Sequence, residues 1–227
     1  MEAIQEFSSL VSRLRAMKER KRVVVVCPND PHTEYVIIRS LREGFADFLL
    51  VADTPHLLNA EYIRQQYPEH VKVFEASSPD VAAQEGVLLV REGHADVLMK
   101  GIINTDNLLR AVLNKEHGLL PKGNVLSHIT VAQIPTYNKL LFFSDAAVIP
   151  RPTLTHFDAM IRYNVEVCRR MGIEAPRVAL IHCTEKVNEK FPHTLDYVAL
   201  KERAEAGEYG QMYLDGPMDA KTACDAH

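Results

Sequence analysis

Short apolar runs alternate along the chain with longer segments in which apolar side chains recur at helical spacing. The first run, Val23–Cys27, is β-branched and bounded by turn residues, which is typical of a strand buried on both faces of a parallel sheet. A turn is predicted at 135–138, between two further runs. The same pattern predicts strands at 47–51, 71–76, 96–100, 129–134, 139–143, 177–183 and 211–214.

Helices are predicted from amphipathic spacing and from boundary residues. In 4–17 the apolar side chains fall on one helical face. Ser78 is placed to be an N-cap, with Pro79 as the first helical residue. Thr155 and Asp158, three residues apart, resemble a capping box at the start of another helix. The predicted helices are 4–17, 55–67, 79–93, one beginning near Thr105 or Asp106, 155–172, 194–206 and one beginning at Pro217.

Repeated strand, loop and helix units require right-handed crossovers and place helices on both faces of a sheet. The expected fold class is therefore α/β, with three layers and a mostly parallel sheet. Pro150 and Pro152 mark a change in composition, so we expect a first α/β domain over 1–148 and a second, partial α/β domain over 149–227. Ligands of such sheets bind outside the carboxyl ends of the strands, and functional residues are expected in the loops there.

Composition narrows the class of protein. The 227 residues are 47% hydrophobic and carry 26 Lys and Arg against 30 Asp and Glu, which describes an ordinary globular chain of net charge −4 without the basic excess of a nucleic-acid partner. No apolar stretch approaches the roughly 18 residues of a membrane span and no signal pattern opens the chain, so we expect a cytoplasmic protein. The four scattered cysteines are expected to be reduced.

Common cofactor and metal motifs are missing from the sequence. The turn after Val23–Cys27 contains no glycine, which disfavours nicotinamide or flavin binding of the usual kind. The glycine-rich nucleotide loop, H-E-x-x-H and G-x-S-x-G are also absent, and the ten histidines are scattered. We therefore expect neither a metal nor a resident cofactor.

The most informative stretch is Met99–Asp106. Lys100 ends a predicted strand, Gly101 lets the backbone approach a ligand, and Thr105 is placed to cap a helix whose first N–H groups are free. A charged amine beside unpaired amides is an anion site. The alternative is a plain turn from strand to helix with an exposed lysine.

A second group of polar residues lies at the ends of other predicted strands. Ser127 and His128 precede an apolar run and could donate to phosphate oxygens, or they could only terminate a loop. Asp145 follows a strand, where a carboxylate orients a partner or caps the next segment. Three further polar residues also follow predicted strands: Glu185, Asn188 and Asp215. The segment with Glu185 and Asn188 is otherwise a solvated loop of mixed charge, and Asp215 otherwise begins a tight turn.

These pieces occur in an order that resembles the phosphate acetyl/butyryltransferase family, over essentially the whole chain. The Met-Lys-Gly and Leu-Ser-His versions of two motifs look more like the butyryl branch. The motifs are Ala95-Asp96-Val97-Leu98-Met99-Lys100-Gly101 with Thr105 and Leu108, Leu126-Ser127-His128, Pro135-x-Tyr137-x-Lys139-Leu140-Leu141, Ser144-Asp145-Ala146-Ala147, Glu185-Lys186-Val187-Asn188, Pro192-x-Thr194-x-Asp196 and Asp215-Gly216-Pro217.

The resemblance implies reversible acyl transfer between coenzyme A, a substrate rather than a cofactor, and inorganic phosphate. It also implies a homodimer of two-domain chains, related in fold to isocitrate and isopropylmalate dehydrogenases, with the active site in the interdomain cleft. The expected phosphate and acyl-phosphate residues are Lys100, Gly101, Thr105, Ser127 and His128, and the expected cleft residues are Asp145, Glu185, Asn188 and Asp215. No residue is assigned as the base that deprotonates the thiol, so the catalytic residues stay unknown.

The sequence also departs from the family pattern. The family carries a C-terminal segment with Ala-Asp-Ile, Gly-Asn and Ser-Arg-x-x-Asp-like motifs, whereas this sequence ends at 225–227 before reaching them. The phosphate-clamping arginine and the thiol base of that segment have no counterpart here. An alternative is therefore a non-catalytic module that binds acyl-CoA or acyl phosphate. An oxidoreductase related only in fold is disfavoured by the glycine-free first turn.

Overall fold

The computed structural model describes residues 2–224 and divides into two compact units. We call Val11–Asn124 the sheet unit, and Met1–Leu10 together with Val125–His227 the hairpin unit. The helix α1, Phe7–Arg15, spans the change from one unit to the other. The boundary predicted after residue 148 falls inside the hairpin unit, and it stays a prediction.

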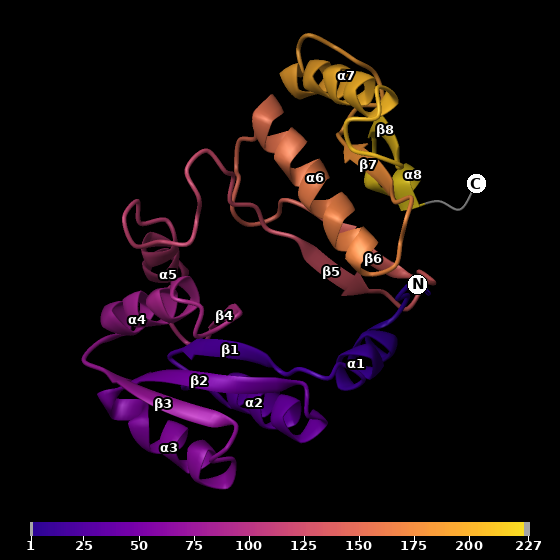
Figure 1. The fold of residues 1–227 in the computed structure, drawn as a ribbon. Coiled ribbons are helices and arrows are strands. Elements are labelled where there is room, and N and C mark those ends of the chain that lie inside the picture. The colour runs from indigo at the N-terminus through magenta and orange to yellow at the C-terminus, as the bar shows by residue number, and fades with distance from the viewer. Residues whose placement is uncertain (1, 225–227) are drawn as a thin grey trace. The chain divides into compact units, whose positions relative to one another are not determined.

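A four-stranded parallel sheet with helices on both faces forms the sheet unit (Figure 1). The strand order is β3-β2-β1-β4. The strands are β1 (Lys21–Val26), β2 (Ala46–Asp53), β3 (Val71–Ala76) and β4 (Val97–Lys100). The helices are α2 (Pro31–Glu43), the 3-10 turn η1 (Thr54–His56), α3 (Leu57–Gln66), α4 (Pro79–Arg91) and α5 (Thr105–Val112).

Alternation of side chains along β1 divides the core of the sheet unit in two. Val24 and Val26 belong to the apolar cluster that includes residues of α4 and α5, and Val25 belongs to the cluster that includes residues of α2 and α3. All three valines are fully buried. Successive strand residues point to opposite faces, so a continuous valine run requires a sheet covered on both sides. The prediction of an α/β fold with a mostly parallel sheet is confirmed.

Two small sheets and two long helices form the hairpin unit. The strands β5 (Thr130–Gln133) and β6 (Leu140–Phe143) pair antiparallel, and β7 (Arg177–Ile181) pairs parallel with β8 (Tyr213–Met218). The helices are α6 (Leu154–Arg170), α7 (Pro192–Glu205) and α8 (Ala220–Cys224). A third apolar cluster packs α6 and α7 against β7.

Two helix starts differ from their predictions. The N-cap of α5 is Asn104, whose side-chain oxygen accepts the Asp106 N–H at 3.0 Å, so Thr105 is the first helical residue and not the cap. At α6 the capping pair is Thr153 and His156: the Thr153 N–H donates to His156 Nδ1 at 3.1 Å. The pair predicted from Thr155 lies inside that helix.

Two further elements were missed or misplaced. The helix α2 was not predicted, although Asp30 caps it by accepting the N–H groups of His32 and Thr33 at 3.0 Å each. The helix predicted to begin at Pro217 is wrong, because β8 continues through Met218 and α8 begins two residues later. The residues 225–227, where the sequence ends, lie outside the described residues.

Candidate functional site

Lys100 lies at the point where the connections of the sheet unit diverge. It is the last residue of β4 and pairs with Val26, the last residue of β1. The helix after β1 packs on one face of the sheet, whereas the helix after β4 packs on the other. In open α/β sheets, ligands bind outside the carboxyl ends of strands at such a switch in direction. The predicted anion site therefore lies where the fold favours a ligand.

Gly101 brings the two loops at this switch into backbone contact. Its N–H donates to the Val26 carbonyl at 2.8 Å, and a Cβ at this position would lie 2.1 Å from the carbonyl oxygen of Cys27. Only glycine fits such an approach. The close neighbour of the glycine is therefore the chain itself, and its approach to a ligand stays a prediction.

The side chains around this switch leave the charge of Lys100 accessible. Lys100 is exposed, and its Nζ donates to the neighbouring Gly101 carbonyl at 3.3 Å. Thr105 is also exposed at the start of α5. Because Asn104 already accepts the Asp106 N–H, fewer free N–H groups remain for an anion than the sequence predicted. The amine supplies the main positive charge of this part of the site.

Ser127, His128 and Asp145 come together in the hairpin unit. The Ser127 hydroxyl donates to Asp145 Oδ2 at 3.2 Å, and the His128 N–H donates to the same oxygen at 2.8 Å. Asp145 Oδ1 accepts the N–H groups of Ala147 at 2.9 Å and Val148 at 2.7 Å. Although burial opposes it, hydrogen bonds from backbone N–H groups lower the pKa of Asp145 to about 2. The carboxylate thus ties the loop before β5 to the loop after β6.

The helix α6 anchors both of these loops. Tyr163 donates its hydroxyl to the Val125 carbonyl at 3.0 Å, and Asn164 Nδ2 donates to Ser144 Oγ at 2.8 Å. Val125 lies two residues before Ser127, and Ser144 lies directly before Asp145. The cluster is therefore held by a helix as well as by its own hydrogen bonds.

The other three candidate residues bond to nearby parts of the hairpin unit. Glu185 accepts the Thr222 hydroxyl at 3.4 Å, and the Asn188 side chain accepts the Lys190 N–H at 2.9 Å. Asp215 pairs with Lys201 at 2.6 Å, and this bond lowers the pKa of Asp215. Within residues 2–224, no hydrogen bond or ion pair joins these three to Ser127, His128 or Asp145. Their substrate contacts stay predictions.

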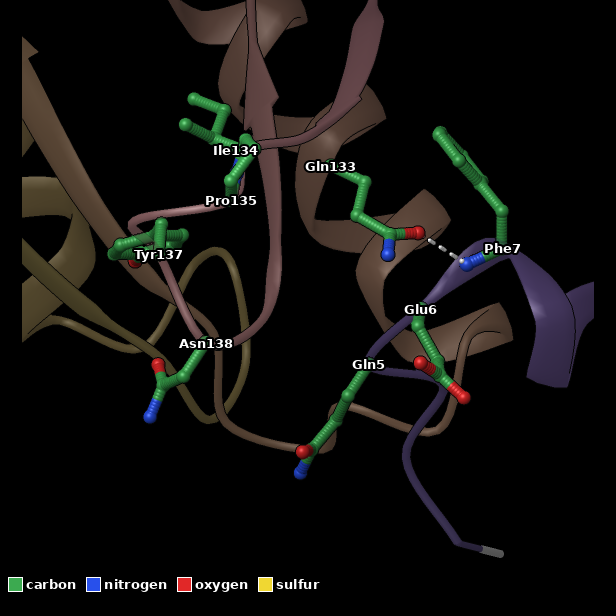
Figure 2. A pocket seen from close by; sticks show the side chains of 8 residues that line it. All are labelled: Gln5, Glu6, Phe7, Gln133, Ile134, Pro135, Tyr137 and Asn138. Atoms are coloured by element: carbon green, nitrogen blue, oxygen red, sulfur yellow. Dashed lines mark hydrogen bonds between the residues drawn. The ribbon is translucent and has the colours of Figure 1, made fainter.

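A hollow in the hairpin unit lies elsewhere (Figure 2). It has a volume of about 540 Å³, and Gln133 closes one side by accepting the Phe7 N–H at 2.8 Å. The candidate residues do not line it. The lining residues are Gln5, Glu6, Phe7, Gln133, Ile134, Pro135, Tyr137 and Asn138. The described part of the chain also holds no group of three or more His, Cys, Asp or Glu side chains arranged to bind a metal ion.

The contact between Asp145 and Ser127 was missed at the sequence level, although a signal for it was present. The two runs 129–134 and 139–143 and the turn between them were predicted, and their antiparallel pairing sets Thr130 opposite Phe143. A hairpin places the residues before its first strand beside the residues after its second strand. The pair was therefore within reach of the pattern. Thr130, whose hydroxyl lies 3.4 Å from His128 Nδ1, was also missed.

The known proteins to which this chain is similar are phosphate acetyltransferases and butyryltransferases. A model of the family described as "Phosphate acetyl/butaryl transferase" matches residues 71–227. The phosphate butyryltransferase of Clostridium acetobutylicum is 34% identical over 218 residues, which cover 95% of this chain and 71% of that protein. The phosphate acetyltransferase of Thermotoga maritima is 30% identical over 199 residues, 87% of this chain and 66% of that protein.

Solved structures agree in fold. A branched-chain phosphotransacylase from Enterococcus faecalis superposes with a TM-score of 0.72 at 25% identity, covering 88% of this chain and 68% of that one. A phosphotransacetylase from Streptococcus pyogenes has the same TM-score at 16% identity, covering 96% of this chain and 76% of that one. The likeness to the second structure bears on the fold alone.

Proposed function

This chain belongs to the phosphate acetyl/butaryl transferase family, and we propose that it transfers a butyryl or acetyl group between coenzyme A and inorganic phosphate. The observation that carries the proposal is the alignment of 95% of the chain with a phosphate butyryltransferase. The geometry supports it with an exposed amine at the switch point of the sheet, and with the Ser127 hydroxyl and the His128 backbone N–H held by Asp145.

The proposed reaction joins a phosphate oxygen to the acyl carbon and breaks the carbon–sulfur bond of acyl-CoA. Monohydrogen phosphate and acyl-CoA give acyl phosphate and free coenzyme A, and the hydrogen of the phosphate ends on the thiol. Lys100, Thr105, Ser127 and His128 bind the phosphate side. The amine of Lys100 and the other hydrogen-bond donors of this set stabilise the negative charge that develops on the oxygens during the transfer.

Direct transfer without an acyl-enzyme suits the cysteines of this chain. Burial raises the pKa values of Cys27 and Cys168 to about 11, so neither thiol supplies a ready thiolate. Cys183 and Cys224 are free and exposed, and neither lies in a nucleophile motif. The thiol of coenzyme A is then the nucleophile in the reverse direction.

Release of free thiol from butyryl-CoA on addition of phosphate tests the proposal. We expect release above the rate without protein, and we expect Lys100→Ala to lower kcat/KM at least about tenfold because a charged contact to phosphate is lost. Lys72→Ala, which removes an exposed lysine from β3, is the matched control and should act like the wild type. Release equal to the rate without protein would contradict a catalytic role.

The second candidate is a module that binds acyl-CoA or acyl phosphate without turnover. The alignment covers 71% of the Clostridium protein, and binding and turnover are therefore tested separately. Calorimetric binding of coenzyme A by a chain that releases no thiol would decide for this candidate.

We also propose that the chain acts in the cytoplasm as a homo-oligomer and uses coenzyme A only as a substrate. The family resemblance supports the oligomer. Light scattering of the purified chain tests the oligomer: a mass of one chain, 25.6 kDa, would contradict it. Cell fractionation tests the location.

A further inference from the structure

The hydrogen bond between Ser127 and Asp145 has a defined direction. The Ser127 oxygen lies 3.2 Å from Asp145 Oδ2. Asp145 is ionised at neutral pH, since its pKa is lowered to about 2, and an ionised carboxylate only accepts hydrogen bonds. The hydroxyl hydrogen of Ser127 is therefore the one that lies between the two side chains.

This direction leaves Ser127 with only oxygen lone pairs to offer to a ligand. The side chain is partly exposed, so a small ligand can reach it. Turning the hydroxyl hydrogen toward the ligand would break a charge-assisted bond to Asp145. The carboxylate cannot follow, because Oδ2 is held by the His128 N–H and Oδ1 by Ala147 and Val148. Asp145 thus acts as a positioning residue: it takes the hydroxyl hydrogen of Ser127, so that Ser127 can only accept a hydrogen bond from a ligand.

We propose that Ser127 accepts a hydrogen bond from the P–OH group of monohydrogen phosphate and so selects phosphate over tetrahedral dianions that carry no hydrogen. The inference rests on the proposed phosphate-binding role of Ser127 and reverses the direction of its contact, from donor to acceptor. Sulfate has nearly the shape and charge of monohydrogen phosphate but would place an oxygen lone pair against that of Ser127. A site built to receive a ligand hydrogen rejects the analogue that lacks it.

Equilibrium binding of inorganic phosphate and of sulfate to the full chain at neutral pH tests this selection. We expect the wild type to bind phosphate at least about tenfold more tightly than sulfate, the effect of one unpaired polar contact. Ser127→Ala should reduce this preference about tenfold, and Ser127→Thr, which keeps a hydroxyl, should retain it. Ser78→Ala, which removes the hydroxyl that caps α4 in the sheet unit, is the control and should retain it too.

The outcomes separate this inference from the proposed function. If the wild type releases thiol with phosphate but Ser127→Ala keeps the wild-type preference, only the inference is overturned. If the wild type releases no thiol but shows the preference and loses it in Ser127→Ala, the inference stands and the catalytic proposal fails. If neither anion binds, both the phosphate role of Ser127 and the inference are overturned.

The thiol of coenzyme A is the other substrate group that could donate to Ser127. Comparing coenzyme A with desulfo-coenzyme A in the wild type and in Ser127→Ala distinguishes the two. We expect the substitution to change the ratio of phosphate to sulfate binding and to leave the ratio for the two coenzymes unchanged. A change confined to the coenzyme ratio would overturn the assignment to phosphate.

Discussion

At Gly101 the space for a side chain is already occupied by the backbone of another loop. A Cβ there would lie 2.1 Å from the Cys27 carbonyl oxygen. We expect Gly101→Ala to lower the free energy of unfolding by about 3 kcal/mol, because backbone cannot yield as a flexible side chain can. The measurement is urea unfolding followed by circular dichroism.

Gly93→Ala is the control for this prediction. Gly93 has a φ of +79°, but no neighbouring atom lies within 4 Å of the position that a Cβ would take, so alanine there should cost only about 1 kcal/mol of backbone strain. If Gly101→Ala is no more destabilising than Gly93→Ala, the contact between the two loops is not tight in solution.

Asp145 makes the stability of the hairpin unit depend on pH. Its pKa is lowered from the ordinary value of 3.8 to about 2. A lowered carboxyl pKa stabilises the folded state fully above the unfolded value, and this stabilisation is lost as the pH falls from 3.8 to about 2. We therefore expect Asp145→Asn to be much less stable than the wild type at pH 7 and closer to it at about pH 2.5, as measured by urea unfolding.

Asp106→Asn, at an exposed carboxylate of α5, is the matched control. Its difference from the wild type should be small at both pH values. A stability deficit of Asp145→Asn that is equally large at neutral and at acidic pH would mean that ionisation of Asp145 is not what holds the two loops.

The start of α5 shows that a sequence pattern can misplace a helix cap by one residue. Asn104 caps α5, and Thr105 is the next residue. We expect Asn104→Ala to lower the free energy of unfolding by about 1 kcal/mol, the usual value of a lost N-cap. Thr105→Ala should leave stability almost unchanged and weaken phosphate binding. Equal loss of stability in the two variants, measured by urea unfolding, would contradict the assignment of the cap.

Elements buried on both faces were the most predictable from the sequence. β1 and β2 overlap their predictions closely, because central strands buried on both faces read as continuous apolar runs. The edge strand at 71–76 also has the predicted bounds. The helix α2 was harder to detect. It exposes Tyr35 and Val36 while burying Ile37, so its apolar pattern is blurred. Only its boundary residues indicated it: Asp30 as the cap, Pro31 at the start and Gly44 at the end.

Contacts within the site depend on pairing between elements, which the sequence indicates only indirectly, here through the turn predicted at 135–138 between two apolar runs. Ser127 and Asp145 were both selected from the sequence, yet their bond was missed because it depends on the β5–β6 pairing. The end of β8 was missed for a related reason. Glycine and proline predict a turn, but β8 runs on to Met218, which pairs with Ile181 after an irregularity in the register at Gly216 and Pro217.

The two compact units differ in how the chain builds them. The sheet unit is one continuous segment, Val11–Asn124, with apolar clusters on both faces of its sheet. The hairpin unit combines the two ends of the chain. Ile4, which is 6% exposed, donates its N–H to the Met171 carbonyl at 2.8 Å. The N-terminal segment therefore packs as part of the hairpin unit.

This difference predicts that the sheet unit folds without the rest of the chain. A domain with its own apolar core and few breaks in connectivity can fold alone, and Val11–Asn124 supplies four paired strands with helices on both faces. We expect a fragment of these residues to unfold cooperatively in urea and to show dispersed amide resonances. A fragment of residues 125–224 is the comparison and should unfold without a cooperative transition, because it lacks Ile4. A cooperative transition in the second fragment, or none in the first, would contradict the division of the chain into these two units.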